Sequence, residues 1–164
     1  MMSLLTFTAG TTALLGSALV AGVFFAFSSF VMKALARRPS AEGIAAMQSI
    51  NVVVINRSFL GAFMGTAVLS LVMAGFAISG WSHPAASFFL GGAIVYIVGT
   101  FMVTALGNVP LNNRLAAVSA SDPATHHVWE RYLDRWTTWN HVRTAAAMVA
   151  SLLYVLGLMQ YAGS

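Results

Sequence analysis

The charged residues of this chain are confined to two stretches of the sequence. All eight Lys and Arg and all four Asp and Glu fall within residues 33–57 and 114–143. Residues 1–32, 58–113 and 144–164 carry no charged side chain and are mostly apolar. A bilayer core needs about 20 such residues for each helical crossing, whereas exposure of these apolar regions to water would be unfavourable. The pattern predicts an integral membrane protein.

The three uncharged regions predict four membrane-spanning helices. The middle region is long enough for two crossings, and Trp81-Ser82-His83-Pro84 supplies the turn between them. Backbone polar groups in hydrocarbon must be satisfied within each helix, and the alternating pattern of a membrane barrel is absent from the sequence. We therefore expect one all-α domain over residues 1–164, an integral membrane four-helix bundle with spans at about residues 4–32, 58–80, 85–107 and 144–161.

Lys and Arg occur only in the two linkers between spans, and positive residues mark the cytoplasmic side of a membrane protein. Both linkers are expected in the cytoplasm, with both termini and the turn at residues 81–84 on the other side of a plasma or inner membrane. Contacts with anionic lipid headgroups, rather than with nucleic acid, explain the pI of about 10.1. A cleaved signal peptide ending at Ala34-Leu35-Ala36 is an alternative, but the apolar run before it is too long and lacks a basic start.

Small residues recur at helical spacing in three of the predicted spans. They are Ala18, Gly22 and Ala26, then Gly61 and Gly65, and finally Ala146 and Ala150. Such patterns let membrane helices approach closely. We expect them to pack within the bundle, and they are also compatible with a homo-oligomer.

The first linker is predicted to form an amphipathic helix that Ser40 caps and that runs through Asn56 into the second span. Its apolar face includes two amides, Gln48 and Asn51, which are expected to point at the bundle. Two interpretations stay open: the amides satisfy neighbouring polar groups, or they contact a ligand.

In the second linker, Pro110 is expected to end the third span, because proline cannot donate to the helical ladder. Asn108 and Asn112 then either provide partners for the broken backbone or contact a ligand. Further along, Ser121-Asp122-Pro123 has the form of a helix start, and the helix it opens is expected to run unbroken into the fourth span.

This last helix carries aromatic and polar residues on one arc, with His141 about 100° away from Asn140. The arc consists of Trp129, Tyr132, Leu133, Trp136, Asn140 and Arg143. An interfacial aromatic belt is one interpretation. A functional site is the other, because polar groups gather here at the mouth of an otherwise apolar bundle. In that case Gln48, Asn51, Asn108, Asn112 and Asn140 should converge on one pocket.

A metal site is not expected. His126 and His127 are adjacent and diverge by about 100° on a helix, and His83 is predicted on the opposite side of the membrane.

The sequence resembles the anthrone oxygenase family of small four-span membrane proteins over nearly its whole length. The resemblance rests on four motifs: Gly22-Val23-Phe24-Phe25-Ala26-Phe27-Ser28, Met47-Gln48-Ser49-Ile50-Asn51, Asn108-Val109-Pro110-Leu111-Asn112 and Trp136-Thr137-Thr138-Trp139-Asn140-His141-Val142-Arg143-Thr144. The last two are the more specific ones.

The resemblance implies oxidation of a planar, hydrophobic aromatic or quinol-like molecule by molecular oxygen, without flavin or haem. The matching residues would then be His141 as general base, Arg143 with Asn140, Asn108 and Asn112 as donors to an oxyanion, and Trp136 with Trp139 as stacking walls. Gln48 and Asn51 would complete the binding site. A non-enzymatic membrane protein that binds a lipid or small hydrophobe, or assists a partner protein, is the alternative function.

Overall fold

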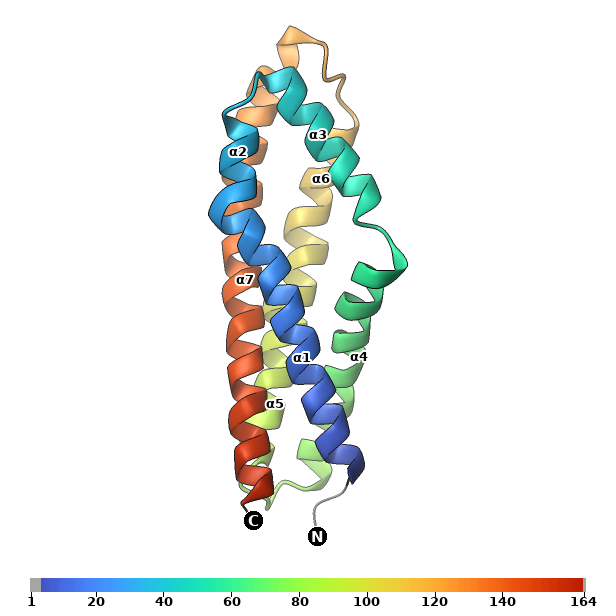
Figure 1. Ribbon diagram of the computed structural model, residues 1–164, viewed down its shortest axis with the longest axis vertical. Helices are drawn as coiled ribbons and strands as arrows, with labels where there is room; N and C mark the ends of the chain where they lie inside the picture. Colours follow the sequence, from blue (N-terminus) through green and yellow to red (C-terminus); the bar gives the residue numbers. More distant parts are fainter. Residues whose placement is uncertain (1–3, 164) are drawn as a thin grey trace.

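The computed structural model describes residues 4–163 as a bundle of long helices that run alternately up and down (Figure 1). The first helix is continuous through α1 (Leu4–Ala26), the π-helical turn η1 (Phe27–Val31) and α2 (Met32–Ala36). The remaining elements are α3 (Ser40–Val53), α4 (Arg57–Ser79), α5 (Ala86–Ile94), the π-helical η2 (Val95–Met102) and η3 (Thr104–Asn108), α6 (Val109–Ala116), the short 3-10 helix η4 (Pro123–Thr125) and α7 (His126–Ala162).

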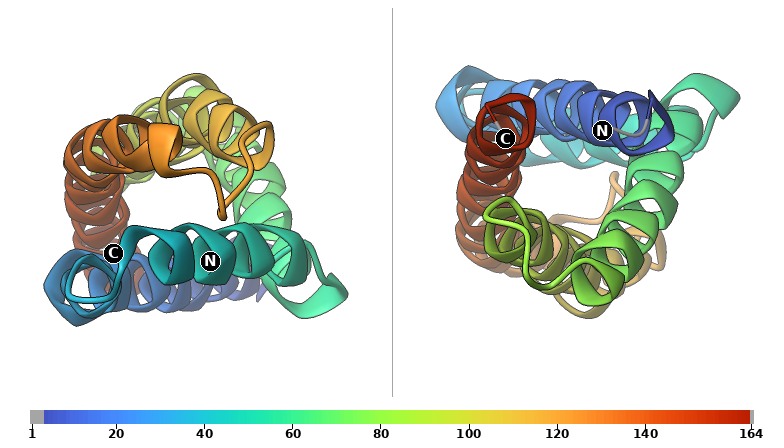
Figure 2. Two further views of the ribbon diagram at one scale, coloured as in Figure 1. Left: turned by 90° about the horizontal axis from the view of Figure 1, so that it is seen from above. Right: turned by 90° about the horizontal axis from the view of Figure 1, so that it is seen from below.

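The long helices form a closed ring, in which α1 packs against α4 and α7, and α5 packs against the same two helices (Figure 2). Four helices are long and apolar enough to cross a membrane: Leu4–Ala36, Arg57–Ser79, Ala86–Ala116 and His126–Ala162. The expected all-α, four-helix membrane bundle is therefore confirmed. Both ends of the described chain lie at the same end of the bundle, as an even number of crossings requires (Figure 1).

Two helix boundaries differ from those expected. The first linker helix does not run into the second span, because it ends at Val53 and a new helix begins at Arg57. Asn56 caps that new helix by accepting a hydrogen bond from Phe59 N at 3.0 Å, which stabilises the break. Ser40 makes no capping bond, and its hydroxyl lies 2.5 Å from His126 Nδ1 instead.

The third span does not end at Pro110. The helix continues through α6 to Ala116, and the turns immediately before the proline are π-helical. The wider π turn accommodates a residue that cannot donate its own backbone hydrogen bond, so the chain stays helical where an α-helix would kink or stop. The fourth helix was predicted better: α7 is continuous to Ala162, and Asp122 Oδ1 accepts from Ala124 N at 2.9 Å in the turn that precedes it.

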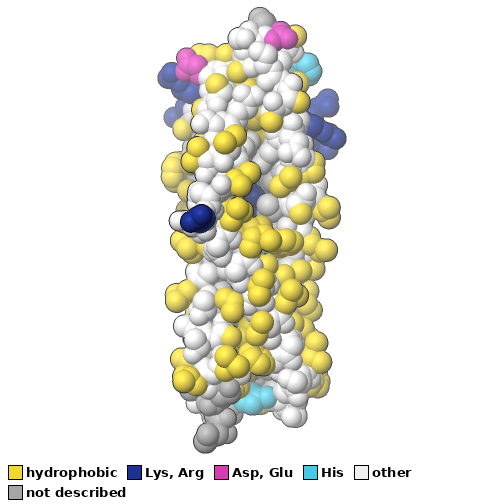
Figure 3. Space-filling model, turned by 90° about the vertical axis from the view of Figure 1, so that its right-hand side faces the viewer, with side chains coloured by type: hydrophobic (Ala, Val, Ile, Leu, Met, Phe, Trp, Pro, Cys, Tyr) yellow, Lys and Arg dark blue, Asp and Glu magenta, His cyan; other side chains and the backbone are white. Residues whose placement is uncertain are grey.

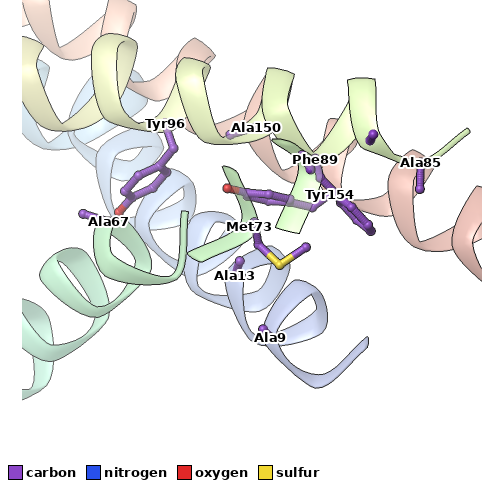
Figure 4. Packing of buried hydrophobic residues seen from close by; sticks show 11 residues of the cluster. Ala9, Ala13, Ala67, Met73, Ala85, Phe89, Tyr96, Ala150 and Tyr154 are labelled. Carbon is purple, nitrogen blue, oxygen red and sulfur yellow. The ribbon is translucent and has the colours of Figure 1, made fainter. Parts of the chain in front are cut away.

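The core nearest the termini is built around two tyrosines and small residues (Figure 4). Tyr96 and Tyr154 are fully buried, and each hydroxyl has a partner: Tyr96 donates to Phe63 O at 3.1 Å and Tyr154 to Ser70 Oγ at 2.8 Å. A buried hydroxyl without a partner would be costly, so these bonds fix the register of α4 against its two neighbours.

Only some of the small residues pack between helices. A Cβ placed on Gly99 would lie 2.6 Å from Ala146 Cβ, which shows that α7 and η2 are in close contact there, and Ala150 is fully buried. Gly22, Gly61 and Gly65, by contrast, have no neighbouring atom within 4 Å of such a Cβ. Packing inside the bundle was thus a wrong prediction for these three glycines, because no other helix approaches them closely.

Candidate functional site

One face of α7 carries a row of buried polar and aromatic residues toward the end of the bundle away from the termini. Trp129, Tyr132, Trp136, Asn140 and Arg143 are buried there, spaced by three or four residues. This is the arc that the helical periodicity predicts. Arg143 lies about 29 Å along the helix from Ala162 at 1.5 Å per residue, which is close to the thickness of the hydrocarbon core.

Arg143 is the buried basic residue of the described chain, with 6 % of its surface exposed. Its Nε and Nη2 donate to Asn140 Oδ1 at 2.9 and 2.7 Å, and its Nη1 donates to Thr104 Oγ1 at 3.3 Å. Both acceptors are neutral, and the ion pairs found within residues 4–163 lie elsewhere, between Arg38 and Glu42 and between His126 and Glu130. The guanidinium charge is therefore buried without a carboxylate to balance it.

Both the Nδ2 and the Oδ1 atoms of Asn140 form hydrogen bonds that position the guanidinium. Its Nδ2 donates to Phe24 O at 2.8 Å and to Ser28 Oγ at 2.7 Å, while its Oδ1 accepts from Arg143. The amide is thus fixed between the first helix and α7, and its oxygen can face only Arg143. Ser28 belongs to η1, and Thr104 to η3, so each π-helical turn contributes a hydroxyl group to this hydrogen-bond cluster.

Aromatic rings surround the guanidinium. Its central carbon lies 3.8 Å from the ring centroid of Phe24 and 5.0 Å from that of Trp136. Toward the middle of the bundle, Phe24 adjoins Phe59 and Phe63, and Phe63 stacks on Phe101 with centroids 5.5 Å apart. Cation–π contacts of this kind stabilise a cation but do not neutralise it.

A second set of rings continues the arc toward the linkers. Tyr132 stacks on both Trp129 and Trp136, with centroids 5.7 and 6.0 Å apart. Asn112 joins two of these residues, because its Oδ1 accepts from Tyr132 Oη at 2.9 Å and from Trp136 Nε1 at 2.7 Å. Asn51 Nδ2 lies 3.5 Å from the same tyrosine oxygen.

The two remaining predicted amides have different environments. Gln48 Nε2 donates to Leu115 O and Val118 O at 2.8 and 2.9 Å, so it satisfies carbonyl groups at the end of α6. Asn108 is 1 % exposed and donates to Trp136 O at 3.1 Å, but its buried Oδ1 has no partner among the described residues. An unsatisfied buried acceptor is costly in a protein interior and is a feature of binding sites.

His141 and Trp139 lie on other faces of α7. Trp139 is 42 % exposed and packs over Gly107, where an added Cβ would lie 2.9 Å from the indole ring. His141 is exposed and lines an open groove of about 390 Å³ between α7 and the first helix. The inner face of α7 carries Arg143, Asn140 and Trp136, and the structure brings Asn108, Asn112 and Asn51 from other helices against this face. His141 and Trp139 lie apart from them.

The sequence interpretation missed several residues of this region. Thr104, Phe24 and Ser28 contact Arg143 or Asn140 directly. Thr100, Thr104 and Asn108 are spaced by four residues, and this spacing could have indicated that Thr104 lies on the same face as Asn108. However, π-helical turns change which residues share a face and leave no clear mark in a sequence. Among residues 4–163, no three His, Asp or Glu side chains lie close enough to share a metal ion.

On the face drawn in Figure 3, hydrophobic side chains are spread over most of the length of the bundle, and most basic side chains lie toward the end away from the termini, with one more protruding about midway. On the face shown there, further basic side-chain atoms lie in a recess between hydrophobic side chains, below the basic groups of that end.

Comparison with known proteins identifies the chain at the level of its family. The model of the anthrone oxygenase family matches residues 51–153, which include Asn108, Asn112, Trp136, Asn140 and Arg143. No curated protein and no solved structure matches the sequence. The matched region covers more than half of the chain and most of its bundle, and the chain therefore belongs to the anthrone oxygenase family.

Proposed function

We propose that this membrane protein oxidises a planar, hydrophobic aromatic compound of the anthrone type with molecular oxygen, and that Arg143 binds the anionic form of that compound. The observation that carries the proposal is the buried guanidinium with neutral partners only, Asn140 and Thr104. A charge beside hydrocarbon is expensive unless it is paired, so such a residue indicates an anionic ligand.

The hydrogen bonds of Arg143 leave donors for that ligand. A guanidinium has five N–H groups, and the contacts with Asn140 and Thr104 use one on Nε, one on Nη2 and one on Nη1. One N–H on each Nη remains, and the planar guanidinium fork can offer these donors to an oxyanion. Lysine has no such fork.

The rings around Arg143 suit a flat ligand. Phe24 and Trp136 contact the guanidinium, Phe24 adjoins Phe63 and Phe101 through ring contacts, and Trp136 stacks on Tyr132. Stacking between aromatic rings is favourable at the centroid distances seen here. A hydrophobic compound dissolved in the bilayer would enter through the lateral surface rather than from water.

The proposed reaction needs few protein groups. Removal of a proton from the methylene carbon of an anthrone gives an anion whose charge is largely on the ring oxygen, where Arg143 would stabilise it. The proton passes to water at the membrane interface, and the electron-rich carbon reduces and binds oxygen to give a peroxide anion, which takes a proton back from water to become a hydroperoxide. Loss of water then leaves the second carbonyl, so that one oxygen atom enters the product and the other becomes water. His141 lies on another face of α7, and a general-base role for it remains a separate prediction.

Oxygen uptake by the purified protein tests the proposal. The assay uses an anthrone in lipid nanodiscs and measures oxygen consumption and anthraquinone formation together, with empty nanodiscs to subtract spontaneous oxidation. We expect equimolar oxygen loss and quinone formation. We also expect Arg143→Lys to lower the rate by at least about 100-fold, the usual effect of removing an oxyanion donor.

The matched control is Arg131→Lys, because Arg131 is an exposed arginine on the same helix. It should retain the wild-type rate. A protein that binds the anthrone but does not accelerate its oxidation would support the non-enzymatic alternative, in which the bundle only carries a small hydrophobe.

A further inference from the structure

The groove that contains His141 lies on the outside of the bundle, between α7 and the segment formed by η1 and α2. Its volume is about 390 Å³. It is lined by Ser28, Met32, Lys33, Ala36, Leu133, Asp134, Thr137, Thr138 and His141. None of these residues contacts the guanidinium of Arg143, and Ser28, which accepts from Asn140 Nδ2, is the groove residue that adjoins the proposed oxidation site.

The groove carries one full charge of each sign. Lys33 and Asp134 are both exposed, and within residues 4–163 neither side chain forms an ion pair or a hydrogen bond. The His141 imidazole and the hydroxyl groups of Thr137 and Thr138 add neutral polar groups. A ligand that matches this lining carries a phosphate for Lys33 and a cation with N–H donors for Asp134.

The depth of the groove matches the headgroup region of a bilayer. His141 is about 32 Å and Asp134 about 42 Å along α7 from Ala162 at 1.5 Å per residue. The hydrocarbon core is about 30 Å thick, and the headgroups extend beyond it. Met148 and Leu152 are exposed apolar residues on the same face of α7 as His141, about two and three turns deeper in the bilayer, where acyl chains would lie.

We propose that this groove binds a phospholipid headgroup that combines a phosphate with a primary ammonium, as in phosphatidylethanolamine. Lys33 and the His141 imidazole contact the phosphate, and Asp134 accepts hydrogen bonds from the ammonium. A trimethylammonium headgroup has no N–H to donate to Asp134, and a glycerol headgroup carries no cation. Both should therefore bind less tightly than ethanolamine.

Native mass spectrometry of the full-length protein in detergent tests this assignment. Phosphatidylethanolamine, phosphatidylcholine and phosphatidylglycerol with identical acyl chains are titrated separately. We expect the ethanolamine lipid to bind at least about tenfold more tightly than the choline lipid, which corresponds to one hydrogen bond to a charged group. Asp134→Asn should remove that difference, whereas Lys33→Gln should weaken binding of all three lipids.

Glu130→Gln is the matched control, since Glu130 is an exposed carboxylate one turn away on α7 that lies outside the groove lining. It should preserve the preference for ethanolamine. Equal binding of ethanolamine and choline lipids by the wild-type protein would overturn the proposal, as would a preference that persists in Asp134→Asn. Displacement of the lipid by free phosphoethanolamine at similar concentration would show instead a site for a soluble phosphoester, and this too would contradict it.

Discussion

Arg143 is the residue on which the functional account depends, and its burial has a consequence for stability. Burying a charge without an ionic partner costs free energy, so the folded protein is less stable than it would be with a neutral residue there. Arg143→Gln removes the charge and keeps an N–H donor for Asn140 Oδ1. We expect the melting temperature of this variant, measured in detergent, to equal or exceed that of the wild type while oxidation is lost. A clear fall in melting temperature would indicate a structural arginine.

Asn112, in contrast to Arg143, is expected to stabilise the folded protein. Its Oδ1 is the common acceptor for Tyr132 Oη and Trp136 Nε1. Asn112→Ala would leave two buried donors without this partner, and each unsatisfied group costs about 1–3 kcal/mol. We expect a lower melting temperature than for Asn113→Ala, a control at the exposed neighbouring position of α6. Equal melting temperatures would mean that water replaces the lost acceptor.

Residue types and their helical spacing were enough to predict part of the site. The arc from Trp129 to Arg143 depends only on a continuous helix, and α7 is continuous. The partners of that arc lie on other helices, and their orientation depends on the π-helical turns η1 and η3. Those turns arise from packing between helices, and therefore Ser28 and Thr104 could not be assigned from local sequence.

Among the helical elements, α7 and η2 pack closely at Gly99. Gly99→Ala would place a methyl group 2.6 Å from Ala146 Cβ, which is too close for either helix to accommodate without moving. Such overpacking costs roughly 1–3 kcal/mol. Gly22→Ala is the matched control, because no atom lies within 4 Å of the new methyl group and alanine favours a helix. We expect thermal unfolding to show destabilisation by the first change and none by the second; the reverse order would contradict the observed helix contact.

The sequence predicted the helical elements but not where they bend. Charge-free length predicted the four spans, because a bilayer imposes that length on any helix that crosses it. The break at Asn56 and the continuation through Pro110 depend on a side-chain cap and on a π-helical turn. The Asn56 cap allows a new helix to begin where a continuous one was expected, and the π-helical turn allows the helix to continue where proline was expected to end it.

For the whole molecule, the positions of the basic residues predict its orientation in the membrane. Most of the Lys and Arg side chains drawn in Figure 3 lie toward the end opposite the termini, which we propose faces the cytoplasm. Alkaline phosphatase fused after Ser164 should then be active, and green fluorescent protein at the same position should be dark. A fluorescent fusion would reverse the proposed orientation and would place the Arg143 site toward the opposite compartment.

Binding of a planar aromatic anion by Arg143 can be tested by an equilibrium measurement that does not require turnover. Anthracene-9-carboxylate and 9-methylanthracene share three fused rings and differ in charge, and their affinities can be measured by fluorescence for the protein in nanodiscs, after subtraction of binding to empty nanodiscs. We expect the wild type to bind the carboxylate at least about tenfold more tightly, as loss of one hydrogen bond to a charged group implies. Arg143→Gln should abolish that preference and Arg131→Gln should keep it. Equal affinities in the wild type, or a preference that survives Arg143→Gln, would contradict the account.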